Sequence, residues 1–161
     1  MAEKLVLVGA IEEIKPFQDQ DWPLHVTVMP WFTVSDRHGE SFVKALGHMI
    51  AQEESPLHLF GDETEYFGSD RSVKVRTLRN ISRIAQLHTE LLGLITRDYA
   101  GTIDSAYIGT QYRPHVTEQA GGKKIEKDQE ITLENLQLIR GNFIGPRIVE
   151  HTFALGKDVS R

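Results

Sequence analysis

The sequence predicts an α+β protein with antiparallel sheets. The expected elements run strand, strand, helix, two strands, helix and then further strands, an order that contains few parallel crossovers. The first strand is the apolar run at residues 4–11 (KLVLVGAI), which is typical of a central strand covered on both faces. With 161 residues, 40% apolar and 25% charged, we expect one globular domain over residues 1–161 that folds without a disulfide or structural metal.

Apolar spacing and the positions of proline and glycine define the other elements. Helices are expected at residues 35–52, beginning at Ser35-Asp36, and from a cap at Asn80 to about Arg97. Pro30 should end the regular pairing of the second strand, and Gly61-Asp62-Glu63 should form an acidic turn. The later strands are expected at residues 24–29, 57–60, 73–78, 106–109, 114–118, 131–139 and 147–155.

Composition excludes several classes of function. The chain has no cysteine, so disulfides, zinc-thiolate sites and a cysteine nucleophile are excluded. A formal net charge of -5 argues against long duplex nucleic acid as a partner, because such binding needs a basic face, whereas a small phosphorylated ligand needs only a few local cations. No window predicts a signal peptide or a membrane span. We expect a cytoplasmic monomer without a membrane partner.

The tripeptide His-Val-Thr occurs twice, at residues 25–27 and at residues 115–117. In an extended strand, residues i and i+2 point to the same face, so each copy would place an imidazole beside a hydroxyl and turn its valine the other way. Two imidazoles can serve as general base and general acid near neutral pH, and hydroxyls can hold phosphoryl oxygens. His25, Thr27, His115 and Thr117 are therefore the candidate catalytic residues.

Two other interpretations of the repeated tripeptide remain open. A single His-x-Thr is commonly a half-buried histidine and a β-favouring threonine that fill a sheet face. Metal ligation by His25 and His115 is a second alternative, although neither copy has another ligand at a recognisable metal spacing. For the other histidines, including His88, surface or core roles are expected.

The two H-x-T motifs, together with Arg113-Pro114 before the second copy, resemble the two-histidine (2H) phosphoesterase superfamily. That group includes the 2′-5′ RNA ligase-like proteins and cyclic phosphodiesterases. The resemblance implies a bilobal, pseudo-two-fold fold, in which two antiparallel sheets with flanking helices surround a central cleft. It also implies metal-independent phosphodiester chemistry without a cofactor, with the histidines as acid and base and the threonines holding phosphate.

The sequence departs from the family pattern in two places. Only about a dozen residues, two of them proline, join the first strand to the first motif, where many members have a helix. After Thr117 the chain continues as Glu118-Gln119-Ala120-Gly121-Gly122 and not as an apolar strand. We therefore expect a trimmed first lobe and inexact symmetry.

The expected substrates are 2′,3′-cyclic phosphates, 2′-5′ linked oligonucleotides or cyclic (oligo)nucleotides, as a small nucleotide or an RNA end. Tyr112 and Arg113 adjoin the second motif, and Trp31 follows the first, so we expect these three to bind substrate by stacking and charge. Two alternatives are a non-catalytic module that binds a nucleotide or RNA end, and a reversible 2′-5′ RNA ligase.

Overall fold

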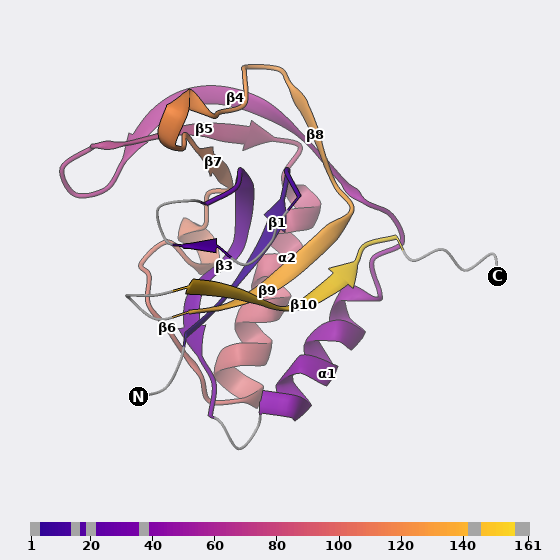
Figure 1. The fold of residues 1–161 in the computed structure, drawn as a ribbon. Helices are drawn as coiled ribbons and strands as arrows, with labels where there is room; N and C mark the ends of the chain where they lie inside the picture. The colour runs from indigo at the N-terminus through magenta and orange to yellow at the C-terminus, as the bar shows by residue number, and fades with distance from the viewer. Residues whose placement is uncertain (1–3, 14–16, 19–21, 36–38, 142–145, 157–161) are drawn as a thin grey trace.

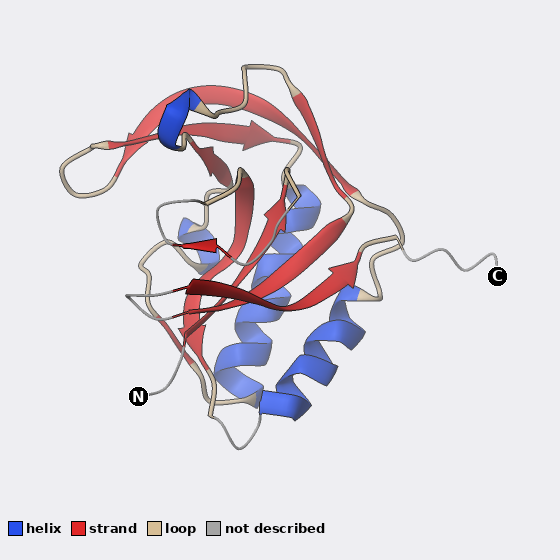
Figure 2. Ribbon diagram, in the orientation of Figure 1, coloured by secondary structure: helices blue, strands red, loops and turns tan. Residues whose placement is uncertain are grey.

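A curled antiparallel sheet with two helices against one face forms the fold (Figures 1 and 2). The computed structural model describes residues 4–13, 17–18, 22–35, 39–141 and 146–156. Every strand pairing in these ranges is antiparallel. The α+β architecture expected from the order of elements is therefore confirmed.

Over the described ranges the sheet has ten strands, nine of which follow one another in a single path, while a short strand pairs at the side of β3. The order is β2 (Phe17–Gln18), β10 (Pro146–Ala154), β9 (Asn135–Gly141), β1 (Lys4–Ala10), β3 (His25–Thr33), β7 (His115–Thr117), β5 (Val73–Arg79), β4 (Leu57–Phe67) and β8 (Glu130–Leu133), with β6 (Thr102–Ile103) beside β3.

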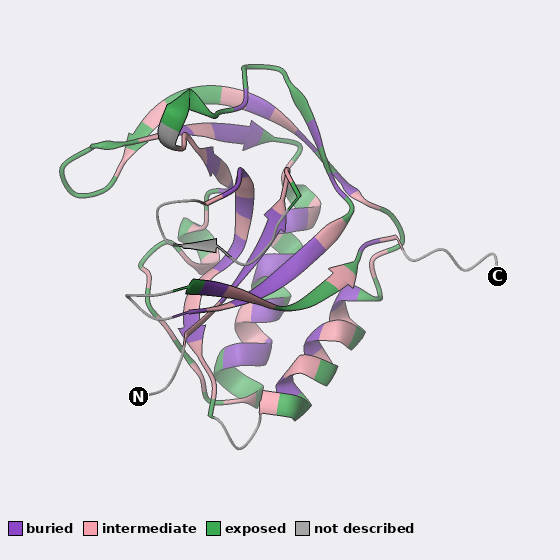
Figure 3. Ribbon diagram, in the orientation of Figure 1, coloured by how far each residue is buried: buried purple, intermediate pink, exposed green. Residues whose placement is uncertain are grey.

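Two helices cover one face of the sheet, and the main core lies between these layers (Figure 3). The helices are α1 (Gly39–Ile50) and α2 (Ser82–Gly93), and α2 continues into a π-helical turn at Leu94–Asp98. Their apolar stripes enter one cluster with the sheet because residues at helical spacing share a face. Within the described ranges, no helix is long and apolar enough to cross a membrane.

The sheet divides into two halves at the contact between β3 and β7. Six strands (β2, β10, β9, β1, β3 and the short β6) lie on one side, and four (β7, β5, β4 and β8) lie on the other. The described ladder between β3 and β7 contains one residue pair, Val26 opposite Val116. The two expected sheets are thus joined into one surface, and an approximate two-fold relation passes through this valine pair.

Two predicted strand ends are wrong, because both strands continue through an irregularity. β3 runs past Pro30 to Thr33, and its pairing with β1 shifts register on either side of Leu7. β4 runs through the expected acidic turn, with a register shift between Gly61 and Thr64. A β-bulge accommodates an extra residue or a proline without ending the strand.

Other boundaries also differ from the predictions. The single strand expected at residues 131–139 is two strands, β8 and β9, which lie in different halves of the sheet. Residues 106–109 form no strand, and a 3-10 turn follows at Gly109–Gln111. Asn80 does not cap α2; it adopts a positive φ of 65°, and its amide donates to the His58 carbonyl. Asp36, the expected start of the first helix, lies outside the described residues.

Candidate active site

The two His-Val-Thr tripeptides lie side by side on neighbouring strands. The first occupies the start of β3, and the second is the whole of β7. Because Val26 faces Val116 in an antiparallel pair, the register places His25 across from Thr117 and Thr27 across from His115. Adjacent strands in a sheet are about 4.8 Å apart, and diagonal neighbours about 7 to 8 Å. The fold thus brings all four candidate residues together.

The valines and the polar residues of the motifs face opposite sides of the sheet. Val26 and Val116 are 0% and 1% exposed and belong to the helix-side core. His25, Thr27, His115 and Thr117 are each half-buried. Alternation along a strand separates the two sets, so one face carries two imidazoles and two hydroxyls.

Each catalytic candidate histidine donates a hydrogen bond to the carbonyl two residues before it. The His25 Nδ1 lies 2.8 Å from the Pro23 oxygen, and the His115 Nδ1 lies 2.7 Å from the Arg113 oxygen. A carbonyl oxygen only accepts, so Nδ1 carries the proton in both rings. Nε2 is therefore the nitrogen that gains and loses a proton, at corresponding positions in the two halves.

Burial lowers the pKa of both imidazoles. For His25 it outweighs the hydrogen bond to Pro23, which raises the pKa, and the charge of His115 lowers it further. For His115 the same burial outweighs the hydrogen bond to Arg113, while the Arg113 guanidinium lowers the pKa further.

Aromatic rings flank the first histidine. The Trp22 ring lies 4.6 Å from the His25 ring between centroids, and Trp31 meets Trp22 edge-on at 6.3 Å. The buried Arg147 guanidinium lies 5.1 Å from the Trp31 ring centre. These two tryptophans pack with Val6, Val8, Ile139 and Val149 in a small cluster separate from the helix-side core. Trp31 is thus linked to His25 through the Trp22 ring.

A different set of rings flanks the second histidine. Phe67, at the end of β4, meets the His115 ring edge-on at 4.7 Å. The exposed Tyr107 ring stacks on Phe67 at 6.2 Å and an interplanar angle of 11°. Arg113 covers Phe67 at 5.3 Å and forms an ion pair with Glu65. Among the three residues predicted to bind substrate, Arg113 is the cation, and it lies beside the second motif.

Tyr112 is half-buried, and both its ring and its hydroxyl have partners. The hydroxyl donates to the Thr27 carbonyl at 2.8 Å, and the ring stacks on His88 at 3.9 Å. Burial raises the pKa of Tyr112, which keeps the hydroxyl protonated. Lys74 and Arg76 share the face of Val116, opposite the histidines, since Arg76 pairs with Val116. Neither lies beside the two imidazoles.

Sequence reasoning did not single out Trp22 or Tyr107. Trp22 stands three residues before His25, and that short spacing could have indicated it. Tyr107 reaches the site through Phe67, which is 40 positions earlier in the chain. No local pattern reports a contact of that kind.

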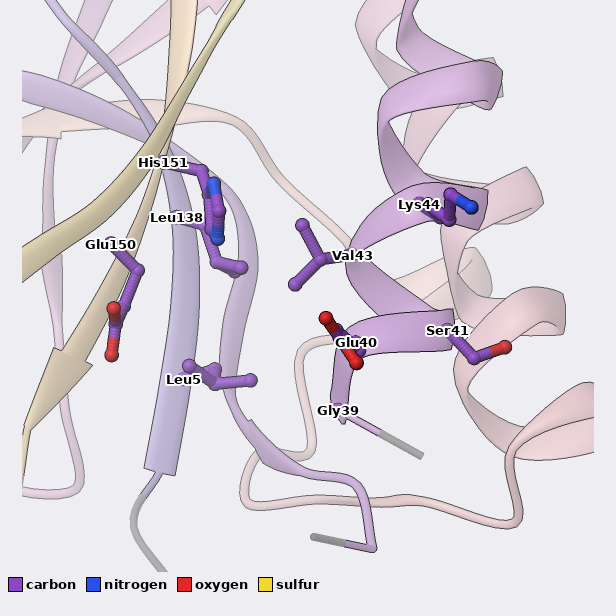
Figure 4. A pocket seen from close by; sticks show the side chains of 9 residues that line it. All are labelled: Leu5, Gly39, Glu40, Ser41, Val43, Lys44, Leu138, Glu150 and His151. Carbon is purple, nitrogen blue, oxygen red and sulfur yellow. The ribbon is translucent and has the colours of Figure 1, made fainter. Parts of the chain in front are cut away.

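A groove lies on the other side of the sheet from the histidines. It has a volume of about 800 Å³ and opens between α1 and the strands β1, β9 and β10 (Figure 4). Its walls contain no residue of either motif; they are Leu5, Gly39, Glu40, Ser41, Val43, Lys44, Leu138, Glu150 and His151. The four motif residues therefore do not belong to this groove.

Among the residues that the structure describes, no group of three or more His, Asp or Glu side chains is arranged to hold a metal ion. The two motif histidines instead use Nδ1 on backbone carbonyls, and each has an aromatic ring as its neighbour. This arrangement suits proton transfer through Nε2.

The family of the chain follows from comparison with known proteins. Residues 4–143 match the sequence profile of the 2′-5′ RNA ligase superfamily. The chain belongs to this superfamily, and the resemblance to the 2H phosphoesterases is confirmed. A search of the curated proteins finds no match.

Solved structures share the fold at low sequence identity. Escherichia coli LigT in complex with 3′-AMP has a TM-score of 0.62 and 14% identity, covering 98% of this chain and 100% of LigT. LigT in complex with NADP+ has a TM-score of 0.59 and 16% identity, covering 97% and 99%. TT0787 of Thermus thermophilus has a TM-score of 0.61 and 17% identity, covering 96% and 99%. These similarities establish a LigT-like fold.

Proposed function

We propose that this protein is a phosphodiesterase that uses two histidines as general acid and base, without a metal ion, on a small nucleotide or an RNA end. One observation carries the proposal: strand pairing places His25, Thr27, His115 and Thr117 on one face, with the valines directly opposite each other. The Nδ1 hydrogen bond of each ring to the carbonyl two residues earlier leaves Nε2 available for proton transfer at corresponding positions of both motifs.

In the proposed reaction a phosphoryl group lies between the two imidazoles. One neutral Nε2 accepts the proton from the attacking water or hydroxyl, which forms the new P–O bond. The other, protonated at Nε2, gives its proton to the leaving oxygen as the old P–O bond breaks. The Thr27 and Thr117 hydroxyls donate to the nonbridging oxygens as negative charge redistributes. The sheet presents both donors on the same face as the rings.

The substrate classes are 2′,3′-cyclic phosphates, 2′-5′ linkages and cyclic (oligo)nucleotides. The LigT complexes contain 3′-AMP and NADP+, which supports a small nucleotide as the substrate class proposed for this chain. Stacked rings beside His115 offer a face for a base, and Arg113 offers positive charge near a phosphate. The net charge of -5 favours short substrates over long RNA.

The test is turnover of these three substrate classes in the presence of EDTA. The single variants His25→Ala and His115→Ala should each lower kcat by about 10²- to 10⁴-fold, which is the usual contribution of a general acid or base. His48→Ala is the matched control, because His48 is an exposed histidine on α1. If both motif variants keep a rate within a few-fold of the parent chain, the acid–base proposal is wrong.

The same experiment separates the proposal from two alternatives. A non-catalytic binding module would bind substrate stoichiometrically and release no product on prolonged incubation. A reversible 2′-5′ RNA ligase would join a 2′,3′-cyclic phosphate end to a 5′-hydroxyl end when both are supplied in excess. ³¹P NMR of the products distinguishes hydrolysis from ligation and reports whether a 2′ or a 3′ phosphate is released.

A further inference from the structure

His88 is a fully buried polar side chain with a backbone partner on each ring nitrogen. It lies on α2, and its relative exposure is 0%. Its Nδ1 is 2.8 Å from the Val28 carbonyl, which only accepts, and its Nε2 accepts the Gly109 N–H at 2.9 Å. These partners fix a neutral ring protonated at Nδ1. Burial also lowers the pKa of His88.

The position of this ring coincides with a break in the ladder between the two motifs. β3 and β7 pair at Val26 and Val116, and the same register, extended by two residues, would place Pro114 opposite Val28. Proline has no N–H, so the backbone cannot continue the ladder there. Two side chains hydrogen bond to the carbonyls at this point instead: Tyr112 to Thr27 and His88 to Val28.

The register of β3 shows why the Val28 carbonyl needs a partner. Leu7 faces Met29 and Val8 faces Thr27, so Val28 is an extra residue in β3. Val28 and Met29 are consequently both buried on the helix side. A bulge leaves its extra residue outside the regular ladder. A buried carbonyl without a donor is costly, and the His88 N–H removes that cost.

His88 and Tyr112 also act on the segment that leads into the second motif. Their rings are parallel within 2° and 3.9 Å apart. Gly109 opens the 3-10 turn that precedes Tyr112 and has a φ of 63°, and its N–H is bound to His88. Tyr112 lies three residues before His115. The stacked pair therefore contacts β3 at the first motif and the chain that enters β7.

We propose that His88 and Tyr112 are positioning residues, which set the register between the two H-x-T motifs by replacing the backbone ladder that Pro114 interrupts. The proposal rests on the function proposed above for its kinetic consequence, though its structural part does not. His88 is fully buried on the helix side, and the Tyr112 hydroxyl is held by the Thr27 carbonyl, so both residues act on the backbone that carries the motifs. Their effect on the reaction acts through the separation and orientation of His25 and His115.

The kinetic test uses Tyr112→Phe, which keeps the stacked ring and removes only the hydroxyl. We expect kcat to fall roughly tenfold or more with KM within about twofold, because small misplacement of catalytic groups is costly while substrate contacts remain. His88→Ala should lower kcat further, and His88→Asn should recover part of that loss, since its amide can donate to Val28. His48→Gln on α1 is the control for an exposed histidine.

A second measurement needs no turnover. NMR titration gives the pKa of His25 with and without His115→Ala, and the difference measures the coupling between the rings, because the charge of His115 lowers the pKa of His25. We expect Tyr112→Phe and His88→Asn each to reduce this difference in the pKa of His25. Circular dichroism should show that both variants are folded. An unchanged coupling between His25 and His115 overturns the positioning role, even if kcat falls in the variants. If the variants lose the coupling and the parent chain turns over no substrate, the positioning role is supported. Only the proposed function is then contradicted.

Discussion

The two halves of the candidate site contain the same tripeptide, but different structures hold it in place. His25 begins a nine-residue strand, β3, that pairs with β1 over most of its length. His115 begins a three-residue strand, β7, that pairs with β5 at three positions and with β3 at one. Both rings nevertheless donate Nδ1–H to the carbonyl of residue i−2.

This comparison shows that local sequence sets the orientation of each ring, while the surroundings differ. The first half relies on a long backbone ladder, and the second relies on side chains: Phe67 against the ring, Tyr112 on β3 and Arg113 with Glu65. Side-chain contacts are individually weaker and easier to lose than a ladder. The second half should therefore be the more sensitive to substitution.

The largest expected effect comes from removing both imidazoles together. If the two rings act as one unit, the double variant His25→Ala/His115→Ala should be no slower than the worse single variant, because effects of residues that act together are not additive. Single-turnover rates of the three variants provide the measurement. A double variant slowed by the product of the single losses would mean that the halves act independently.

The threonines come next. Thr27→Val and Thr117→Val each remove a hydroxyl while keeping a β-branched shape, and each should lower kcat by about 10²-fold if the hydroxyl stabilises developing charge. Thr152→Val on β10 is an exposed strand control. Equal losses at the two positions would indicate symmetric use of the halves. A loss at one position alone would show that only that half holds the phosphoryl oxygens.

The two valines should separate stability from activity. Val26→Ala and Val116→Ala remove buried methyl groups from the same core, so each should lower the free energy of unfolding by about 1 to 3 kcal/mol, measured by urea titration. We expect only Val116→Ala to lower the kcat of the folded chain as well, since β7 has few backbone pairs. Equal kcat losses in the two variants would contradict the asymmetry.

The smallest expected effect is a shift in pH dependence. The Arg113 charge lowers the pKa of His115, so Arg113→Met should raise that pKa and move one limb of the bell-shaped profile of kcat/KM to higher pH. A general base must be neutral, so a shift of the rising limb would make His115 the base. A shift of the falling limb would make it the acid. Movement of neither limb would contradict the electrostatic effect of Arg113.

Much of the fold could be predicted from local patterns. The apolar run that became β1, the two amphipathic helices and the β4–β5 pairing depend on periodicity and on residues close in the chain. Two of the boundaries that failed share one cause, which is that tertiary packing overrode a local signal. Pro30 lies within an irregular part of β3, and Glu134 separates two strands that belong to different halves.

The candidate site divides in the same way. Sequence indicated the four motif residues because each tripeptide carries its own alternation. It placed Tyr112 and Arg113 near the second motif but could not say what they contact. The sequence predicted only a core or surface role for His88. Its partners Val28, Gly109 and Tyr112 are at least 21 residues away in the chain, so no local pattern indicates them.

The sequence by itself determined that each His-Val-Thr presents an imidazole and a hydroxyl on one side and a valine on the other. That result depends only on the two-residue repeat of an extended chain. The tertiary structure decided that Val26 faces Val116, because pairing between strands about ninety residues apart depends on burial and on contacts from other elements. Pro114 ends the backbone ladder at this point, and His88 and Tyr112 form the hydrogen bonds beyond it.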